Sequence, residues 1–189
     1  MIKKGSISFF MCLILAGCGS QKKIMSHQNN CSIIIASEED LAANYKMFFT
    51  STSAFNTKQL TDFDKIENGV LFYKGQEQLR KGTFLIVDFD NDFIASKKME
   101  GFNNNVNFSL KDKDQLKHII EGLKKESYYQ NCVVNDGHAS MYLLVIRYNN
   151  EKIVQYYSPF HSPYGIKATD CSIKSIQELI GILDQNYYK

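Results

Sequence analysis

The segment from Met141 to Tyr157, MYLLVIRYNNEKIVQYY, constrains the fold most. Its residues 141–146 are apolar at consecutive positions, and successive side chains of a strand point to opposite faces of a sheet. This run therefore predicts a central strand that is covered on both faces. Asn149-Asn150 is typical of a tight hairpin turn, and Ile153 to Tyr157 then form the returning strand.

Three segments, 38–49, 112–126 and 172–186, have the apolar spacing of helices that bury one face. Candidate capping residues are Ser37 for the first helix, Asp112 with Gln115 for the second and Ser172 for the third. The expected inward-facing residues are Leu41, Tyr45, Phe48 and Phe49; Leu116, Ile119, Ile120 and Leu123; and Ile173, Ile176, Leu179, Ile180 and Leu183.

Further strands are predicted at 32–36, 69–73 and 83–89, whereas Asn103-Asn104-Asn105 predicts a loop. Residues 50–68 are polar and weakly patterned, although Phe55, Leu60 and Phe63 could pack under a loop. Together these patterns predict one α+β domain over residues 31–189, an antiparallel sheet with helices near 38–49, 112–126 and 172–186.

The N-terminus carries the clearest functional signal. Lys3 and Lys4 precede a short apolar run from Ile7 to Leu15, which is the pattern of a secretory signal peptide. The following Leu15-Ala16-Gly17-Cys18 resembles the lipobox of bacterial lipoproteins. The resemblance implies cleavage before Cys18, diacylglycerol on its sulfur and usually an acyl chain on its new amine. An uncleaved apolar anchor is the alternative, but the run is short for a bilayer span.

The predicted organisation is then a signal peptide at 1–17, a lipidated tether at 18–30 and the domain at 31–189. Two or three acyl chains would hold the protein on a membrane of the cell envelope. With Gly19 after the lipidated cysteine, the outer membrane facing the periplasm is expected if the cell is Gram-negative.

The charge of the mature chain excludes one class of partner. Loss of Lys3 and Lys4 leaves 20 of the 22 basic residues against 20 acidic residues, a net charge of zero. A nucleic-acid-binding domain needs a basic face, so no nucleic acid is expected as a partner. No metal-ligand spacing or phosphate-binding loop is present either, and no cofactor is expected.

Cys31, Cys132 and Cys171 remain in the mature domain, an odd number in a compartment that permits disulfides. The three cysteines could form one disulfide and leave one free thiol, or all three could be buried thiols. Because Cys132 follows the second predicted helix and Cys171 precedes the last, we expect a Cys132–Cys171 disulfide with Cys31 unpaired.

The segment NCVVNDGHAS places Cys132 and His138 on either side of a turn. The GHA that runs into a strand looks like the histidine segment of papain-like cysteine peptidases, which would make Cys132 or Cys31 a nucleophile and His138 its base. A catalytic thiol often lies at a helix N-terminus, which lowers its pKa. Both cysteines lie beside strand-like runs instead. The favoured interpretation is a structural cysteine and a histidine at the edge of a sheet.

Two other segments resemble binding sites. Asp88, Asp90 and Asp92 imitate the start of a calcium-binding EF-hand loop, but Phe93 and Met99 stand where that loop needs glycine and glutamate. The segment 158–165 contains both prolines of the chain and several aromatic residues. Prolines rigidify a loop, so this segment is either a recognition loop or a loop folded over the core. As a recognition loop it would bind through Tyr157, Phe160, His161 and Tyr164.

The sequence as a whole favours a non-enzymatic envelope lipoprotein with a protein-binding domain. Its expected location and its size are comparable to those of envelope inhibitors and immunity proteins. The alternative is a cysteine-dependent hydrolase that uses Cys132 or Cys31 with His138. A structural envelope protein without a specific ligand is a third reading.

Overall fold

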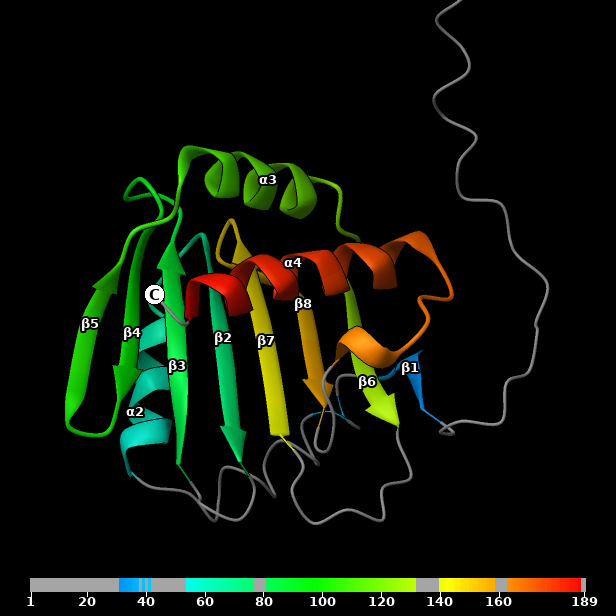
Figure 1. Ribbon diagram of the computed structural model, residues 1–189, viewed down its shortest axis with the longest axis horizontal. Coiled ribbons are helices and arrows are strands. Elements are labelled where there is room, and N and C mark those ends of the chain that lie inside the picture. Colours follow the sequence, from blue (N-terminus) through cyan, green and yellow to red (C-terminus); the bar gives the residue numbers. More distant parts are fainter. Residues whose placement is uncertain are drawn as a thin grey trace, which may run out of the picture.

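The computed structural model describes residues 31–37, 39, 41, 54–76, 81–131, 140–158 and 163–187. Within them one sheet of eight strands carries helices on both faces, so the predicted α+β class is confirmed (Figure 1).

The sheet has the order β1-β6-β8-β7-β2-β3-β4-β5. The strands are β1 (Ser32–Ile35), β2 (Gly69–Gln76), β3 (Lys81–Asp88), β4 (Ile94–Met99), β5 (Phe102–Val106), β6 (Glu126–Asn131), β7 (Ser140–Tyr148) and β8 (Glu151–Ser158). Every neighbouring pair is antiparallel except β6 and β8, which are parallel, so the sheet is mixed rather than purely antiparallel.

The central position of β7 agrees with the sequence. It lies between β8 and β2, and Met141 to Leu144 and Ile146 are buried. The turn to β8 is formed by Asn149 and Asn150, whose φ angles of 52° and 63° lie in the left-handed region. Two consecutive residues in this region are typical of the type I′ turn, whose twist matches that of the flanking strands.

Two of the predicted helices are present with shifted ends. They are α3 (Leu110–Glu121) and α4 (Cys171–Tyr187). The α3 helix begins earlier than expected because Ser109 is its N-cap and accepts a hydrogen bond from the amide of Asp112, so Asp112 is not the cap. It also ends before 126, because Gly122 is its C-cap and Glu126 already belongs to β6.

The last helix is capped by Asp170 rather than by Ser172. The Asp170 carboxylate accepts a hydrogen bond from the amide of Ile173 at 2.9 Å. All five apolar residues predicted to face inward from this helix are buried. A Lys74–Asp184 ion pair of 2.8 Å, largely shielded from solvent, joins the helix to β2.

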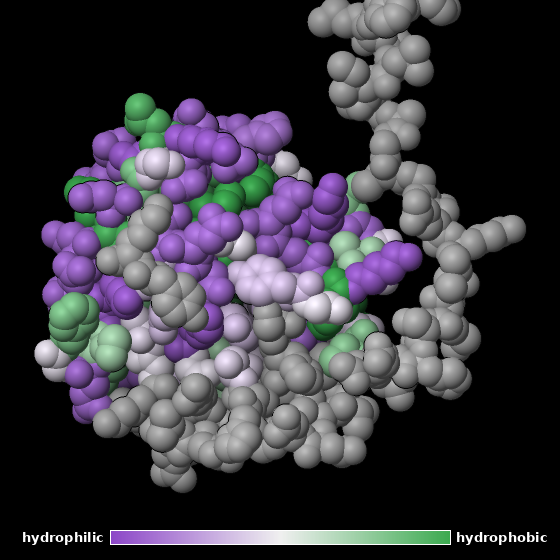
Figure 2. All heavy atoms as spheres, in the orientation of Figure 1, coloured by the Kyte–Doolittle hydropathy of each residue, from purple (hydrophilic) through white to green (hydrophobic). Residues whose placement is uncertain are grey.

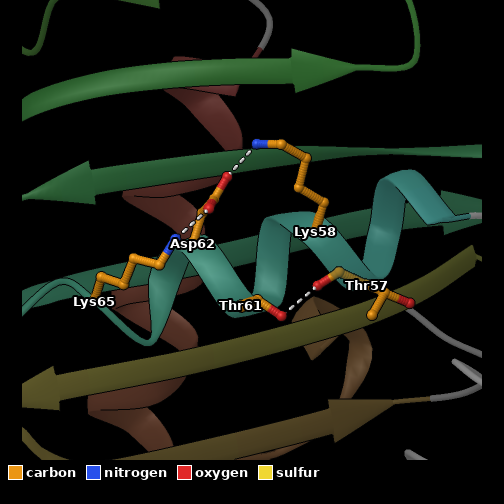
Figure 3. A network of polar contacts seen from close by, with 5 residues as sticks. All are labelled: Thr57, Lys58, Thr61, Asp62 and Lys65. Atoms are coloured by element: carbon orange, nitrogen blue, oxygen red, sulfur yellow. Dashed lines mark hydrogen bonds and ion pairs between the residues drawn. The ribbon is translucent and has the colours of Figure 1, made fainter.

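The sequence did not predict α2 (Ala54–Phe63). Its inward face includes the polar side chains of Asn56 and Gln59, which weaken the apolar pattern that usually reveals a helix. On its outer surface Asp62 accepts hydrogen bonds from Lys58 at 2.5 Å and from Lys65 at 3.0 Å (Figure 3). These bonds lower the pKa of Asp62 to about 2. Of the helix predicted at 38–49, residues 39 and 41 are helical, and the rest lies outside the described residues.

The sheet separates two apolar clusters because successive side chains of a strand point to opposite faces. Val70 and Phe72 of β2 pack in the cluster beneath α3 and α4. Leu71 and Tyr73 pack in the other cluster, with Phe63 of α2. The fold is therefore a three-layer arrangement with α4 lying across one face of the sheet and α2 on the other (Figure 1).

Candidate binding surfaces

Five of the residues singled out from the sequence fall in segments outside the described residues. These are Cys18, Cys132, His138, Phe160 and His161. The strands that precede the segments of the last four in the sequence, β6 and β8, are parallel neighbours that end at Asn131 and Ser158.

The other two predicted binding residues have different surroundings. Tyr157 is buried, and its ring lies 6.0 Å from that of Tyr129, so the ring belongs to the core rather than to an exposed recognition surface. Tyr164 lies in a short 3-10 helix, η2 (Pro163–Gly165), and is 47% exposed. Its hydroxyl donates to the carbonyl of Ile180 at 3.1 Å, which holds the ring against α4. Of the two, only Tyr164 presents surface to a partner.

The buried tyrosines form polar contacts inside the domain. The hydroxyl of Tyr156 donates to Gln130, and that of Tyr128 donates to Glu126 at 2.5 Å. Burial raises the pKa of both tyrosines above the ordinary value, and the hydrogen bond to Glu126 raises that of Tyr128 further. These phenols therefore stay neutral near pH 7 and satisfy buried polar groups instead of serving as bases.

Cys171 is disulfide-bonded, and so is Cys31. The expectation that Cys31 stays unpaired is therefore wrong. A sulfur in a disulfide has no thiolate, so Cys31 does not supply the nucleophile of the alternative hydrolase. The partnership of Cys132 with Cys171 stays a prediction because Cys132 lies outside the described residues.

The three carboxylates of the acidic turn after β3 each bind different partners. Asp88 accepts hydrogen bonds from the amide of Asp90 and the side chain of Asn91, and Asp92 forms an ion pair of 2.8 Å with Lys113. Asp90 accepts from Asn68. Throughout the described ranges, no group of three or more histidine, cysteine or acidic side chains is arranged to hold a metal ion.

The β5 edge is the first of two apolar surfaces at the ends of the sheet. Its hairpin tip pairs Met99 of β4 with Phe102 of β5, and these side chains are 41% and 51% exposed. The three asparagines that predicted a loop, Asn103 to Asn105, instead continue β5 as an exposed strand. Figure 2 shows hydrophobic atoms at the left margin, where Figure 1 places the β4–β5 hairpin. Among the described strands, none pairs with the outer side of β5.

The β1 edge is the second surface, at the opposite end of the sheet. Ile34 is 44% exposed and Ile35 is 61% exposed, whereas Ile33 is buried in the core. Within the described residues, β6 is the one strand that pairs with β1. A groove of about 340 Å³ borders the C-terminal end of β1 and is lined by Ile35, Ala36, Lys125, Glu126, Ser127, Lys152, Ile153, Val154 and Gln155.

The charges around this groove are largely compensated. Lys125 forms an ion pair of 3.2 Å with Glu151. Lys152 donates to Gln155 at 2.9 Å, and the carboxylate of Glu126 accepts from Tyr128. The groove therefore has little net charge with which to attract an ionic ligand.

Neither edge surface was recognised from the sequence. Phe102 precedes an asparagine run that has the composition of a loop, so nothing in the sequence indicated an exposed strand there. The residues of β1, Ser32 to Ile35, have the composition of a buried strand. A strand rich in apolar residues looks the same whether it lies inside a sheet or at its end.

None of the helices within the described residues is long and apolar enough to cross a membrane. Comparison of the chain with protein-family models, with curated proteins and with solved structures finds no match.

Proposed function

We propose that this chain is a membrane-anchored lipoprotein of the cell envelope whose domain binds another protein without catalysis, as inhibitors and immunity proteins do. The anchor is the lipid on Cys18 of the Leu15-Ala16-Gly17-Cys18 box. The outer membrane, facing the periplasm, is the expected location in a Gram-negative cell.

The observation that carries the binding role is the β5 edge with exposed Phe102 and Met99 at its hairpin tip. An open strand edge offers backbone donors and acceptors to an extended segment of a partner. An adjacent aromatic side chain adds apolar contact, and aromatic residues are enriched among those that dominate binding energy. Asn103 to Asn105 are exposed and uncharged, so they keep the edge polar without the lysines that often protect an open edge.

Phe102→Glu tests the binding role. The full-length lipoprotein and this variant are each purified from envelope extract after cross-linking in cells, and the cross-linked proteins are compared by mass spectrometry. A partner that binds at the β5 edge should be recovered with the unsubstituted protein and lost with Phe102→Glu. Tyr148→Glu is the matched control, because Tyr148 is also an exposed aromatic residue but lies at the β7–β8 hairpin.

Two outcomes would contradict the proposal. A partner retained equally by Phe102→Glu would show that the β5 edge is not the binding surface. Rapid alkylation of Cys132 by iodoacetamide near neutral pH would indicate a thiol of depressed pKa and would restore the hydrolase alternative with His138.

Lipidation is tested separately by Cys18→Ser. This variant should remain an unprocessed precursor and incorporate no labelled palmitate, because the acceptor sulfur is absent. Normal palmitate incorporation would remove the membrane anchor from the proposal.

A further inference from the structure

We propose that the β1 edge of the domain docks on the surface of the phospholipid bilayer, with Ile34 and Ile35 in the interfacial layer. This inference rests on the proposed lipid anchor at Cys18. It assigns the two outermost described strands of the sheet to different partners, the bilayer at β1 and a protein at β5.

The length of the chain between the anchor and the sheet selects β1. Cys31 directly precedes β1 and lies 13 residues after Cys18. Fully extended, 13 residues span at most about 45 Å. The eight strands of the sheet, spaced about 4.8 Å apart, separate β1 from β5 by roughly 34 Å.

The tether can therefore place β1 against the membrane at almost any extension. To place β5 there, it would have to run most of the width of the sheet and become nearly straight. Straightening costs conformational entropy at every residue. The anchored domain consequently presents its β1 edge to the bilayer more often than its β5 edge.

The side chains of the β1 edge suit a shallow membrane contact. Ile34 and Ile35 are adjacent in the strand and point to opposite faces of the sheet, so both flank its open edge. An open strand edge cannot enter the hydrocarbon core, where its backbone groups would lack hydrogen-bond partners. In the headgroup layer water and lipid oxygens satisfy these groups, so the contact stays at interfacial depth.

The charges beside this edge make the contact insensitive to lipid charge. The Lys125–Glu151 ion pair is internally neutral, and Lys152 and Glu126 balance one another in the groove. Binding should therefore be similar on zwitterionic vesicles and on vesicles with anionic lipid, in contrast to a polybasic surface.

The chain contains no tryptophan, so a single introduced tryptophan reports on one position. The full-length lipidated Ile35→Trp variant is reconstituted in phosphatidylcholine vesicles that carry bromine at shallow or deep acyl positions. Phe102→Trp, at the opposite edge of the sheet, is the matched control. The reporter at position 35 should be blue-shifted and quenched at least twofold more by the shallow bromines than the reporter at position 102.

Equal quenching of the two reporters, or quenching of neither, would overturn the inference. A blue shift at position 35 that depends on protein concentration and not on brominated lipid would also overturn it, because it would indicate a second copy of the chain at this edge. Ile34→Trp repeats the measurement if Ile35→Trp fails to fold.

Failure of the anchor is distinguishable from failure of the docking. If the proposed lipidation is wrong, the chain carries no acyl label and does not float with the vesicles. If only the docking is wrong, the labelled chain floats with the vesicles while the reporter at position 35 stays accessible to aqueous acrylamide.

Discussion

The ring of Tyr73 on β2 occupies the space that a side chain at Gly82 on β3 would need. An added Cβ at Gly82 would lie 2.2 Å from atoms of the Tyr73 ring. Gly75 is paired directly with Gly82, and a Cβ at that position would meet the same ring. The paired glycines thus leave room for the buried ring of Tyr73 over the sheet. The centroid of this ring lies 4.7 Å from the centroid of the Phe84 ring.

Gly82→Ala should therefore destabilise the domain by about 1–3 kcal/mol, the usual cost of overpacking a core. Gly181→Ala is the control, because its added Cβ would make ordinary contact with Tyr164 at 3.8 Å inside α4. That control should stabilise the domain by about 0.5–1 kcal/mol through helix propensity. Urea unfolding followed by circular dichroism measures both changes, and equal stability of the two variants would contradict the packing of Tyr73.

Leu179 and Leu123 should differ in their contribution to stability. Leu179 is fully buried in α4, so Leu179→Ala should cost about 2–5 kcal/mol. Leu123 is only partly buried and follows the end of α3, so Leu123→Ala should cost less. A loss under about 0.5 kcal/mol at Leu179, typical of exposed sites, would show that α4 packs by another face.

Reduction should weaken the domain because Cys31 and Cys171 are both disulfide-bonded. Removing a native disulfide from a small exported domain typically costs about 2–5 kcal/mol, so dithiothreitol should lower the urea midpoint accordingly. Cys171→Ser should lower the urea midpoint even without reduction, because it removes one of the bonded cysteines. An unchanged midpoint would mean that the disulfide does not constrain the fold.

Peptide mapping without reduction identifies the pairing itself. A peptide that links Cys132 to Cys171 would support the pairing predicted from the sequence. A Cys31–Cys171 peptide would refute that pairing and leave Cys132 as the remaining thiol of the mature domain.

Alkaline unfolding should be coupled to the buried tyrosines. Burial, together with a smaller effect from the negative charge of ionised Tyr187, raises the pKa of Tyr73 to about 12. A phenol with a raised pKa in the folded state contributes stability in full below the unfolded pKa of about 10 and loses it as the pH rises through the folded value. The domain should therefore lose stability between pH 10 and 12.

Absorbance at 295 nm tests this coupling. Tyr73, Tyr128 and Tyr156 should ionise together with the loss of far-ultraviolet circular dichroism. Tyr73→Phe should reduce the protons released on unfolding near pH 11 by about one. Smooth ionisation of all tyrosines before unfolding would contradict the burial of Tyr73.

Local patterns in the sequence were sufficient for several elements of the fold. The apolar run from Met141 and the Asn149-Asn150 turn identified β7, its hairpin and its central position, because strand periodicity and left-handed turn residues act over a few neighbours. The apolar face of α4 was also correct, from Ile173 to Leu183, because helical spacing is a local property. The lipobox is a local signal of the same kind.

Other elements depended on partners distant in the sequence. Asn103 to Asn105 form a strand because they pair with β4, and α2 forms against the sheet despite its buried Asn56 and Gln59. The same dependence on distant partners applies to the candidate surfaces. Ile34 is exposed and Tyr157 is buried, although both lie in apolar strands.

The sequence by itself therefore determined which segments form the central hairpin and the two helices of one face. Only the tertiary structure decided that β1 and β5 are the outermost described strands and that β6 pairs in parallel with β8. The physical reason is that the order of strands in a sheet depends on hydrogen bonds and packing between segments far apart in the chain. Exposure of Ile35 or Phe102 follows from that order and not from the residues beside them.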